Sequence, residues 1–551
     1  MRHKHLRRTF IAVLGIAILV AIQLWPAPPV PLGRDTTFVI APLAEDGLPN
    51  YAQAIVEQHG EGIAADDNGA KLLWQAIGPN GIRRNSRERL FQELGIAQPV
   101  APYLIDAGDK EQLRDLEAWC AEQRAKAGLA HQDDEEESAA CFALAGKLAD
   151  AIQQRPWRPE QLLPLASLLK TNQDALNLLV EAAAKPRMAT PAVDLLADPN
   201  KPAMALLGFQ AQALRTAARG LCVRAMERIA DHDYKSAWRD LLASWRLGAQ
   251  AAAGPTLIDG HMGVAIRRGA ACGTLALLQA DDLDKDLTKQ IMLDLEAQPT
   301  AIDVIDAIDF TERCQMLDYL LRVSTDRLGG LPGDEETFSN WRLNPTPMLR
   351  LCNAWFDRFV AAVALPDRAQ RDQELSRLAA ELEEVRQPSI VSMLRIVRNR
   401  QKQSEMVASL FLAIPIQSID QALKVRDRDQ THMALIRVAA ALALYRIQEG
   451  AYPGALNDLI DVNIVRALPD DPYTDQPFVY QRRGDGYLLY SLYENSVDDG
   501  GNDAEQPIVG GEWIDDIDFR QPDRNASDLV IRLPLPPLEL PLQAAPKDAK
   551  P

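Results

Sequence analysis

An acidic, glycine-containing loop near the carboxyl end carries the side chains best suited to chemistry. Asp498 and Asp499 are adjacent, Gly500 and Gly501 follow them, and further acids lie downstream. Calcium prefers several hard oxygen ligands and tolerates a flexible loop, in which glycines permit sharp turns. The ligands do not alternate as they do in an EF-hand. Two interpretations stay open, a calcium-binding loop and a solvated Asp-Gly turn.

Histidine-based chemistry has less support. His232 lies between two aspartates and His261 between glycine and methionine, yet neither has a partner at metal-ligand spacing. The chain contains no H-E-x-x-H motif, phosphate-binding loop, nucleophile elbow or dinucleotide fingerprint. We expect no catalytic residues and interpret His232 as part of an interhelical turn. A buried cluster of Asp231, His232 and acids from distant helices would instead favour an enzyme.

Composition limits the classes of function. The chain has 551 residues, 47% of them hydrophobic and 25% charged, so two or more folded units are expected. The formal charge of −18 argues against a general nucleic-acid binder, which needs a basic surface to neutralise phosphates. We therefore expect protein partners and a membrane contact, with no nucleic acid.

The six cysteines do not form a metal-binding or redox motif, because none lies in a C-x-x-C pair. In an exported chain some could form disulfides, and Cys120–Cys141 is the most plausible local bridge. The alternative is that several are small buried apolar residues.

The amino-terminal segment predicts a membrane anchor. Residues 1–8 are basic, and an apolar run over 9–25 follows, close to the length of a spanning helix. The run ends in Leu24-Trp25 without a clear small-residue cleavage site, which favours an uncleaved signal anchor over a cleaved signal peptide. The positive-inside rule then keeps 1–8 cytoplasmic and exports the remainder. We expect a single pass through the inner (cytoplasmic) membrane, followed by a Pro-rich linker over 26–48.

Residues 49–403 are expected to form a large all-α domain. Its clearest piece is a helix–turn–helix around Asp231–Asp233, which resembles a tetratricopeptide pair although only one copy is present. The residues predicted to line the two helices are Leu214, Leu221, Ala225 and Ile229, then Ala237, Trp238, Leu241, Leu242 and Trp245.

Residues 404–534 are expected to form a small α+β domain, a long helix on a short antiparallel sheet. The helix has two apolar stripes and should be buried on two sides, against the sheet and against the helical domain. Gly450 is its expected stop. Strands are predicted at 478–481, 487–493 and 527–534, the first two joined by a hairpin around 483–486. The tail, 535–551, is Pro-rich and expected to be disordered. The stripe residues are Leu435, Val438, Leu442 and Tyr445, and Met433, Ile436, Ala440, Leu444 and Ile447.

The order of motifs in this domain resembles the C-terminal domain of the major pseudopilin of type II secretion. The motifs are Glu-Gly-x-Tyr-Pro at 449–453, Leu-Pro-x-Asp-Pro at 468–472, a Tyr-containing hairpin that begins with Pro477 to Tyr480, then Tyr490-Ser491, Asn495 to Gly501, and Asp516-Ile517. The resemblance implies a structural calcium ion in the final loop. It would place Asn495, Asp498 or Asp499, and Asp516 near the ion, with the Ser491 carbonyl as a further ligand.

The amino terminus departs from that family. A pseudopilin begins with a processed hydrophobic helix bearing a glutamate, and this chain lacks that pattern. We therefore expect a non-enzymatic, membrane-anchored bacterial envelope protein with a scaffold or protein-binding role and a calcium-stabilised, pseudopilin-like C-terminal domain. The alternative is an accessory component of a type II secretion or pilus-like system.

Overall fold

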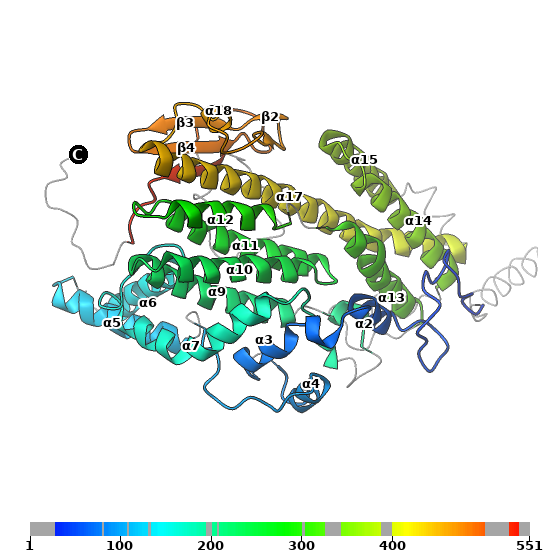
Figure 1. Cartoon of the computed structure of the whole chain (residues 1–551). Coiled ribbons are helices and arrows are strands. Elements are labelled where there is room, and N and C mark those ends of the chain that lie inside the picture. Colours follow the sequence, from blue (N-terminus) through cyan, green and yellow to red (C-terminus); the bar gives the residue numbers. More distant parts are fainter. Residues whose placement is uncertain are drawn as a thin grey trace, which may run out of the picture.

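The structure is a computed structural model that describes residues 28–79, 82–106, 110–129, 134–193, 201–206, 209–299, 303–325, 343–386, 399–501 and 528–538. It is mainly helical, with a small antiparallel sheet near the carboxyl end, as predicted (Figure 1). The expected anchor at 9–25, Asp516 and most of the tail at 535–551 lie outside the described residues and stay predictions.

Helices form most of the described chain. They are α2 (Tyr51–Gly60), α3 (Ala70–Ile77), α4 (Arg87–Glu93), α5 (Lys110–Lys126), α6 (Asp134–Ala151), α7 (Leu163–Ala183), α9 (Phe209–Ala230), α10 (Tyr234–Ala252), α11 (Leu257–Leu278), α12 (Lys285–Glu296), α13 (Arg313–Ser324), α14 (Pro345–Val363), α15 (Arg368–Arg386), α17 (Arg400–Glu449) and α18 (Asp458–Asp461). A short π-helix, η3 (Ala307–Glu312), leads directly into α13.

The predicted helix–turn–helix is confirmed as α9 and α10. Every residue predicted to line it is buried except Leu242, which is partly buried. The turn depends on two local features. His232 adopts a positive φ of 61°, and the Asp233 side chain caps α10 by accepting a hydrogen bond from the Ser236 backbone N–H. His232 is therefore part of the interhelical turn, as expected.

Two hydrophobic cores share the 50-residue helix α17. Residues 433–443 of α17 belong to a first core with α3, α7 and α9–α12, whereas residues 407–423 belong to a second core with α2 and α13–α15. The helix extends about 75 Å at 1.5 Å per residue. In Figure 1 it spans most of the width of the molecule, from beneath the β3–β4 sheet to α14, and so joins the two cores.

The carboxyl-terminal lobe (residues 450–501 and 528–538) covers one side of α17. Strands β3 (Val479–Arg483), β4 (Gly486–Ser491) and β5 (Leu529–Leu533) form an antiparallel sheet in that order. Its hairpin pairs Arg483 with Gly486, as predicted. A second, two-stranded ribbon of β1 (Asp470–Asp471) and β2 (Gln476–Pro477) lies ahead of β3, where no strand was predicted.

The burial of α17 on two sides is confirmed. The lobe lies on one side of its carboxyl half, and α11 and α12 lie on the other (Figure 1). The stripe residues are buried, apart from Tyr445 and Ile447, which are partly buried. Gly450 ends the helix with a left-handed φ of 80°. Among the described helices α17 alone is long and apolar enough to cross a membrane, but its apolar carboxyl half fills the first core.

The second part of the segment expected to be a linker packs on the helices. Tyr51 donates from its hydroxyl to the Thr37 carbonyl, and Asn353 of α14 donates to the Thr36 carbonyl at 2.7 Å. The Arg313 guanidinium lies 4.4 Å from the centroid of the Phe38 ring. Residues 36–38 are therefore held against the second core.

All six cysteines are buried free thiols. The possible bridge between Cys120 of α5 and Cys141 of α6 is not formed, and the Cys141 thiol instead donates to Glu137. The six cysteines are therefore small buried side chains, which was the alternative interpretation.

Candidate functional site

The loop after β4 brings together three of the five residues predicted to bind calcium. Asn495 donates to Asp499 at 3.0 Å, and Asp498 accepts hydrogen bonds from the Tyr490 hydroxyl at 2.8 Å and the Gly500 N–H at 2.9 Å. Ser491, whose backbone carbonyl was the expected ligand, lies at the end of β4, and its hydroxyl donates to Asp471 at 2.8 Å. Asp516 lies outside the described residues.

A carboxylate that sequence reasoning missed lies beside this loop. Asp528, directly before β5, is 3% exposed and accepts a hydrogen bond from the Gly501 N–H at 2.8 Å. Its other oxygen, Oδ1, is buried without a partner among the described residues. Burial raises the pKa of Asp528 and the Gly501 N–H lowers it, while the charges of Asp499 and Asp498 raise it further; the net shift is upward.

These residues fit a calcium ion by their chemistry. Carboxylate and amide oxygens are the hard ligands that calcium prefers, and the unpartnered Asp528 Oδ1 needs a positive or donating group. In the described part of the chain, no three acidic, histidine or cysteine side chains lie close enough together to hold a metal ion, and this includes Asp498, Asp499 and Asp528. These three carboxylates would have to move closer together to hold an ion, which would then supply the positive charge that offsets their repulsion.

Asp471 organises the lobe from the Leu-Pro-x-Asp-Pro motif. It is buried and accepts hydrogen bonds from the Tyr473 N–H at 3.0 Å, the Leu492 N–H at 3.1 Å and the Ser491 hydroxyl. It therefore ties the β1–β2 ribbon to the end of β4. The motif drew attention to this aspartate, but only the fold shows that its role is structural.

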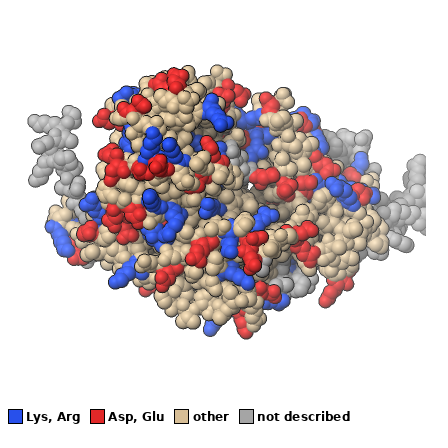
Figure 2. Space-filling model, in the orientation of Figure 1, with Lys and Arg blue, Asp and Glu red and all other residues tan. Residues whose placement is uncertain are grey.

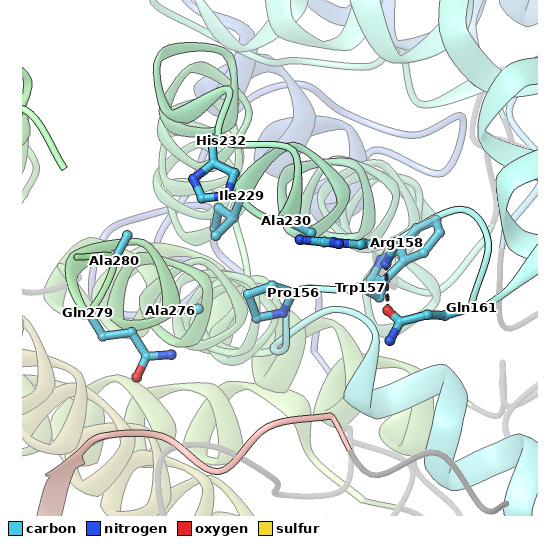
Figure 3. A pocket seen from close by; sticks show the side chains of 10 residues that line it. All are labelled: Pro156, Trp157, Arg158, Gln161, Ile229, Ala230, His232, Ala276, Gln279 and Ala280. Carbon is cyan, nitrogen blue, oxygen red and sulfur yellow. Dashed lines mark hydrogen bonds between the residues drawn. The ribbon is translucent and has the colours of Figure 1, made fainter. Parts of the chain in front are cut away.

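A pocket of about 420 Å³ lies where the α9–α10 turn meets the carboxyl end of α11 and the segment before α7 (Figure 3). Its apolar wall includes Ile229 and Ala276, and polar side chains such as Arg158, Gln161 and Gln279 surround it.

His232, at the edge of this pocket, has an acidic partner that was not foreseen. Its Nδ1 lies 3.0 Å from Asp282 Oδ2, and the Tyr234 hydroxyl donates to the same carboxylate. Asp282 comes from the α11–α12 connection, 50 residues further along the chain. The His232 and Asp282 side chains are both 61% exposed, so this group is not the buried cluster that would favour an enzyme.

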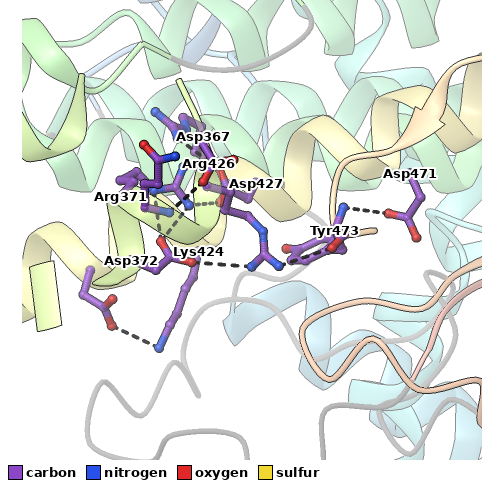
Figure 4. A network of polar contacts seen from close by, with 11 residues as sticks. Asp367, Arg371, Asp372, Lys424, Arg426, Asp427, Asp471 and Tyr473 are labelled. Atoms are coloured by element: carbon purple, nitrogen blue, oxygen red, sulfur yellow. Dashed lines mark hydrogen bonds and ion pairs between the residues drawn. The ribbon is translucent and has the colours of Figure 1, made fainter. Parts of the chain in front are cut away.

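A second pocket, of about 220 Å³, lies between α15, α17 and the lobe (Figure 4). Arg371 of α15 forms ion pairs with Asp427 of α17 and with its neighbour Asp372. Arg426 also donates to Asp427, at 3.1 Å. The buried Tyr473 hydroxyl, which has no partner among the described residues, lies in the pocket wall. The charged groups mainly satisfy one another, so the network chiefly joins three elements.

Acidic and basic side chains alternate over the face seen in Figure 2. No protein-family model, curated protein or solved structure matches the chain. The pseudopilin resemblance therefore rests on the motifs in the sequence.

Proposed function

We propose that the chain is a non-enzymatic, membrane-anchored protein of a bacterial envelope. Its helical body would scaffold or bind other proteins on the exported side of the inner membrane. Its C-terminal lobe would be a pseudopilin-like module that calcium stabilises. An antiparallel sheet packed on a long helix supports this interpretation, because the motifs of the resemblance follow one another along this lobe in the expected order.

One observation carries the calcium part of the proposal. The acidic loop after β4 meets a buried aspartate, Asp528, that has an oxygen without a partner among the described residues. A bound cation would satisfy this oxygen and reduce the repulsion among the three carboxylates. Because calcium would bind the folded loop better than the unfolded chain, it would raise the free energy of unfolding.

Calcium titration of the full chain in detergent tests this. After treatment with EDTA, calcium should bind in calorimetry and raise the melting temperature by a few degrees, whereas magnesium should do so less. Asp528→Asn should abolish both responses while leaving the metal-free protein folded, since it removes a repelling charge. Asp485→Asn, at the exposed hairpin tip, is the matched control and should respond like the parent. Failure of the parent chain to bind calcium would refute the calcium part.

The second candidate function is an accessory component of a type II secretion or pilus-like system. The order of pseudopilin motifs favours it, since a shared module could engage a true pseudopilin. Crosslinking in native membranes separates the two candidates. Exclusive capture of secretion components would support the accessory role, and capture of unrelated envelope proteins would support the general scaffold.

A further inference from the structure

The chain after β5 runs onto the helical body. The Leu535 N–H donates to Gln279 Oε1 at 2.9 Å, and Leu535 is buried in the first core. Leu538 also packs against that core. The two leucines are three residues apart, which is the repeat of a polyproline II helix, and prolines dominate this segment. The last described residues, 535–538, therefore pack on the helical body.

This docked segment lies at the edge of the 420 Å³ pocket. Gln279 both accepts the hydrogen bond from Leu535 and forms part of the pocket wall. In Figure 3 the segment after β5 passes along the side of the pocket where Gln279 and Pro156 lie. The next residues of the chain therefore start within reach of the pocket.

We propose that the pocket is the docking site of this chain's own Leu-Pro tail, residues 539–546, in a polyproline II conformation. Continuing the repeat of three from Leu535 and Leu538 places Pro541 and Ala544 on the docking face. Both are small and apolar, and they suit a wall formed by Ile229 and alanines. From Leu538 to Pro541 the helix advances about 9 Å.

The polar rim suits the backbone of such a segment. Carbonyl groups in polyproline II have no internal partners, so the Gln161 and Arg158 side chains can donate to them. Arg158 is exposed and its guanidinium forms no ion pair among the described residues, while Glu539 supplies an opposite charge.

Disulfide trapping in the full chain tests the proposal, because all six native thiols are buried. Ala280→Cys in the pocket wall is combined with Leu540→Cys in the tail, and oxidation is followed by mass spectrometry. The pair should crosslink at least about tenfold faster than the control pair of Val100→Cys with Leu540→Cys, because docking raises the effective concentration of the two thiols. Equal rates, or disulfides formed between two copies, would overturn the proposal.

A blocking variant checks that the pocket itself is responsible. Ala230→Trp in the same double-cysteine chain should fill the cavity and reduce crosslinking to the rate of the control pair. Ala230→Ser, the matched substitution, should leave the rate high. Fast crosslinking that persists with Ala230→Trp would show that the tail lies near Ala280 without entering the pocket, and would also overturn the proposal.

Discussion

At the residue scale, Asp471 of the lobe is a buried acceptor with three hydrogen-bond donors. Asp471 receives the Tyr473 and Leu492 N–H groups and the Ser491 hydroxyl. Removing such an acceptor leaves buried donors without partners, each at a cost of about 1–3 kcal/mol. We expect Asp471→Ala to lower the free energy of unfolding by at least about 3 kcal/mol, measured by chemical denaturation. Asp470→Ala is the matched control, because that neighbour is exposed and should change stability little.

A second residue-scale prediction concerns pH. Burial raises the pKa of Glu312 from 4.5 to about 7, and Asp259 also raises it, while the Leu257 N–H lowers it. The folded state therefore holds the proton more tightly than the unfolded chain. The protonated Glu312 carboxyl therefore makes its full contribution to the free energy of unfolding below about pH 4.5. This contribution is lost as the pH rises to about 7 and the carboxyl ionises.

Glu312→Gln should remove this dependence. Above pH 7 the variant should be more stable than the parent by about 3 kcal/mol, and near pH 4 the two should be equal. Denaturant midpoints between pH 4 and pH 8 measure the difference. Glu449→Gln, at an exposed position, should follow the parent at every pH. A constant gap between Glu312→Gln and the parent over this range would contradict the prediction.

At the scale of elements, a polar section of α17 joins the two cores. Asp427 pairs with Arg371 of α15, and Asp429 lies 3.2 Å from Arg267 of α11. All four side chains are almost fully buried. Each pair ties a different helix to α17, so together they define how α15 and α11 lie along it.

Breaking one of these buried ion pairs should lower the free energy of unfolding more than breaking an exposed ion pair does. Asp427→Ala would leave Arg371 with only one of its two carboxylate partners, and we expect a loss of about 3–5 kcal/mol in the free energy of unfolding. Asp420→Ala, which removes the more exposed ion pair with Lys424 two helical turns earlier on the same face of α17, should lower the free energy of unfolding by at most about 1 kcal/mol. Equal losses in urea denaturation would show that the buried pair does not hold α15 to α17.

The elements were more predictable than the contacts between them. The two stripes of α17, the turn at His232 and the hairpin at 483–486 all follow from periodicity and local turn chemistry, which neighbouring residues determine. Asp528, Asp282 and Arg371 act through partners far away in the chain, so spacing could not reveal them. One signal was present: Asp427, Asp429 and His432 directly precede the apolar stripes of α17, and polar side chains that become buried require partners.

At the scale of the whole molecule, α17 should make the two cores unfold together. Phe356 of α14 is fully buried in the second core, while β4 belongs to the lobe at the other end of α17. If α17 couples the two cores, a cavity created at Phe356 in the second core should also lower the stability of the lobe. The lobe belongs to the first core and not to the core that contains Phe356.

Native-state hydrogen exchange measures this coupling. Phe356→Ala should lower the free energy of unfolding by about 3–5 kcal/mol and should speed exchange of the β4 amides about as much as that of the α14 amides.

Gln430→Pro, between the two cores on α17, should break the helix and confine the effect of Phe356→Ala to the second core. Gln448→Pro, near its end, is the matched control and should leave the coupling intact. If Phe356→Ala leaves β4 exchange unchanged in the otherwise unaltered chain, the cores are independent units. The polar section of α17 would then act as a flexible joint between them.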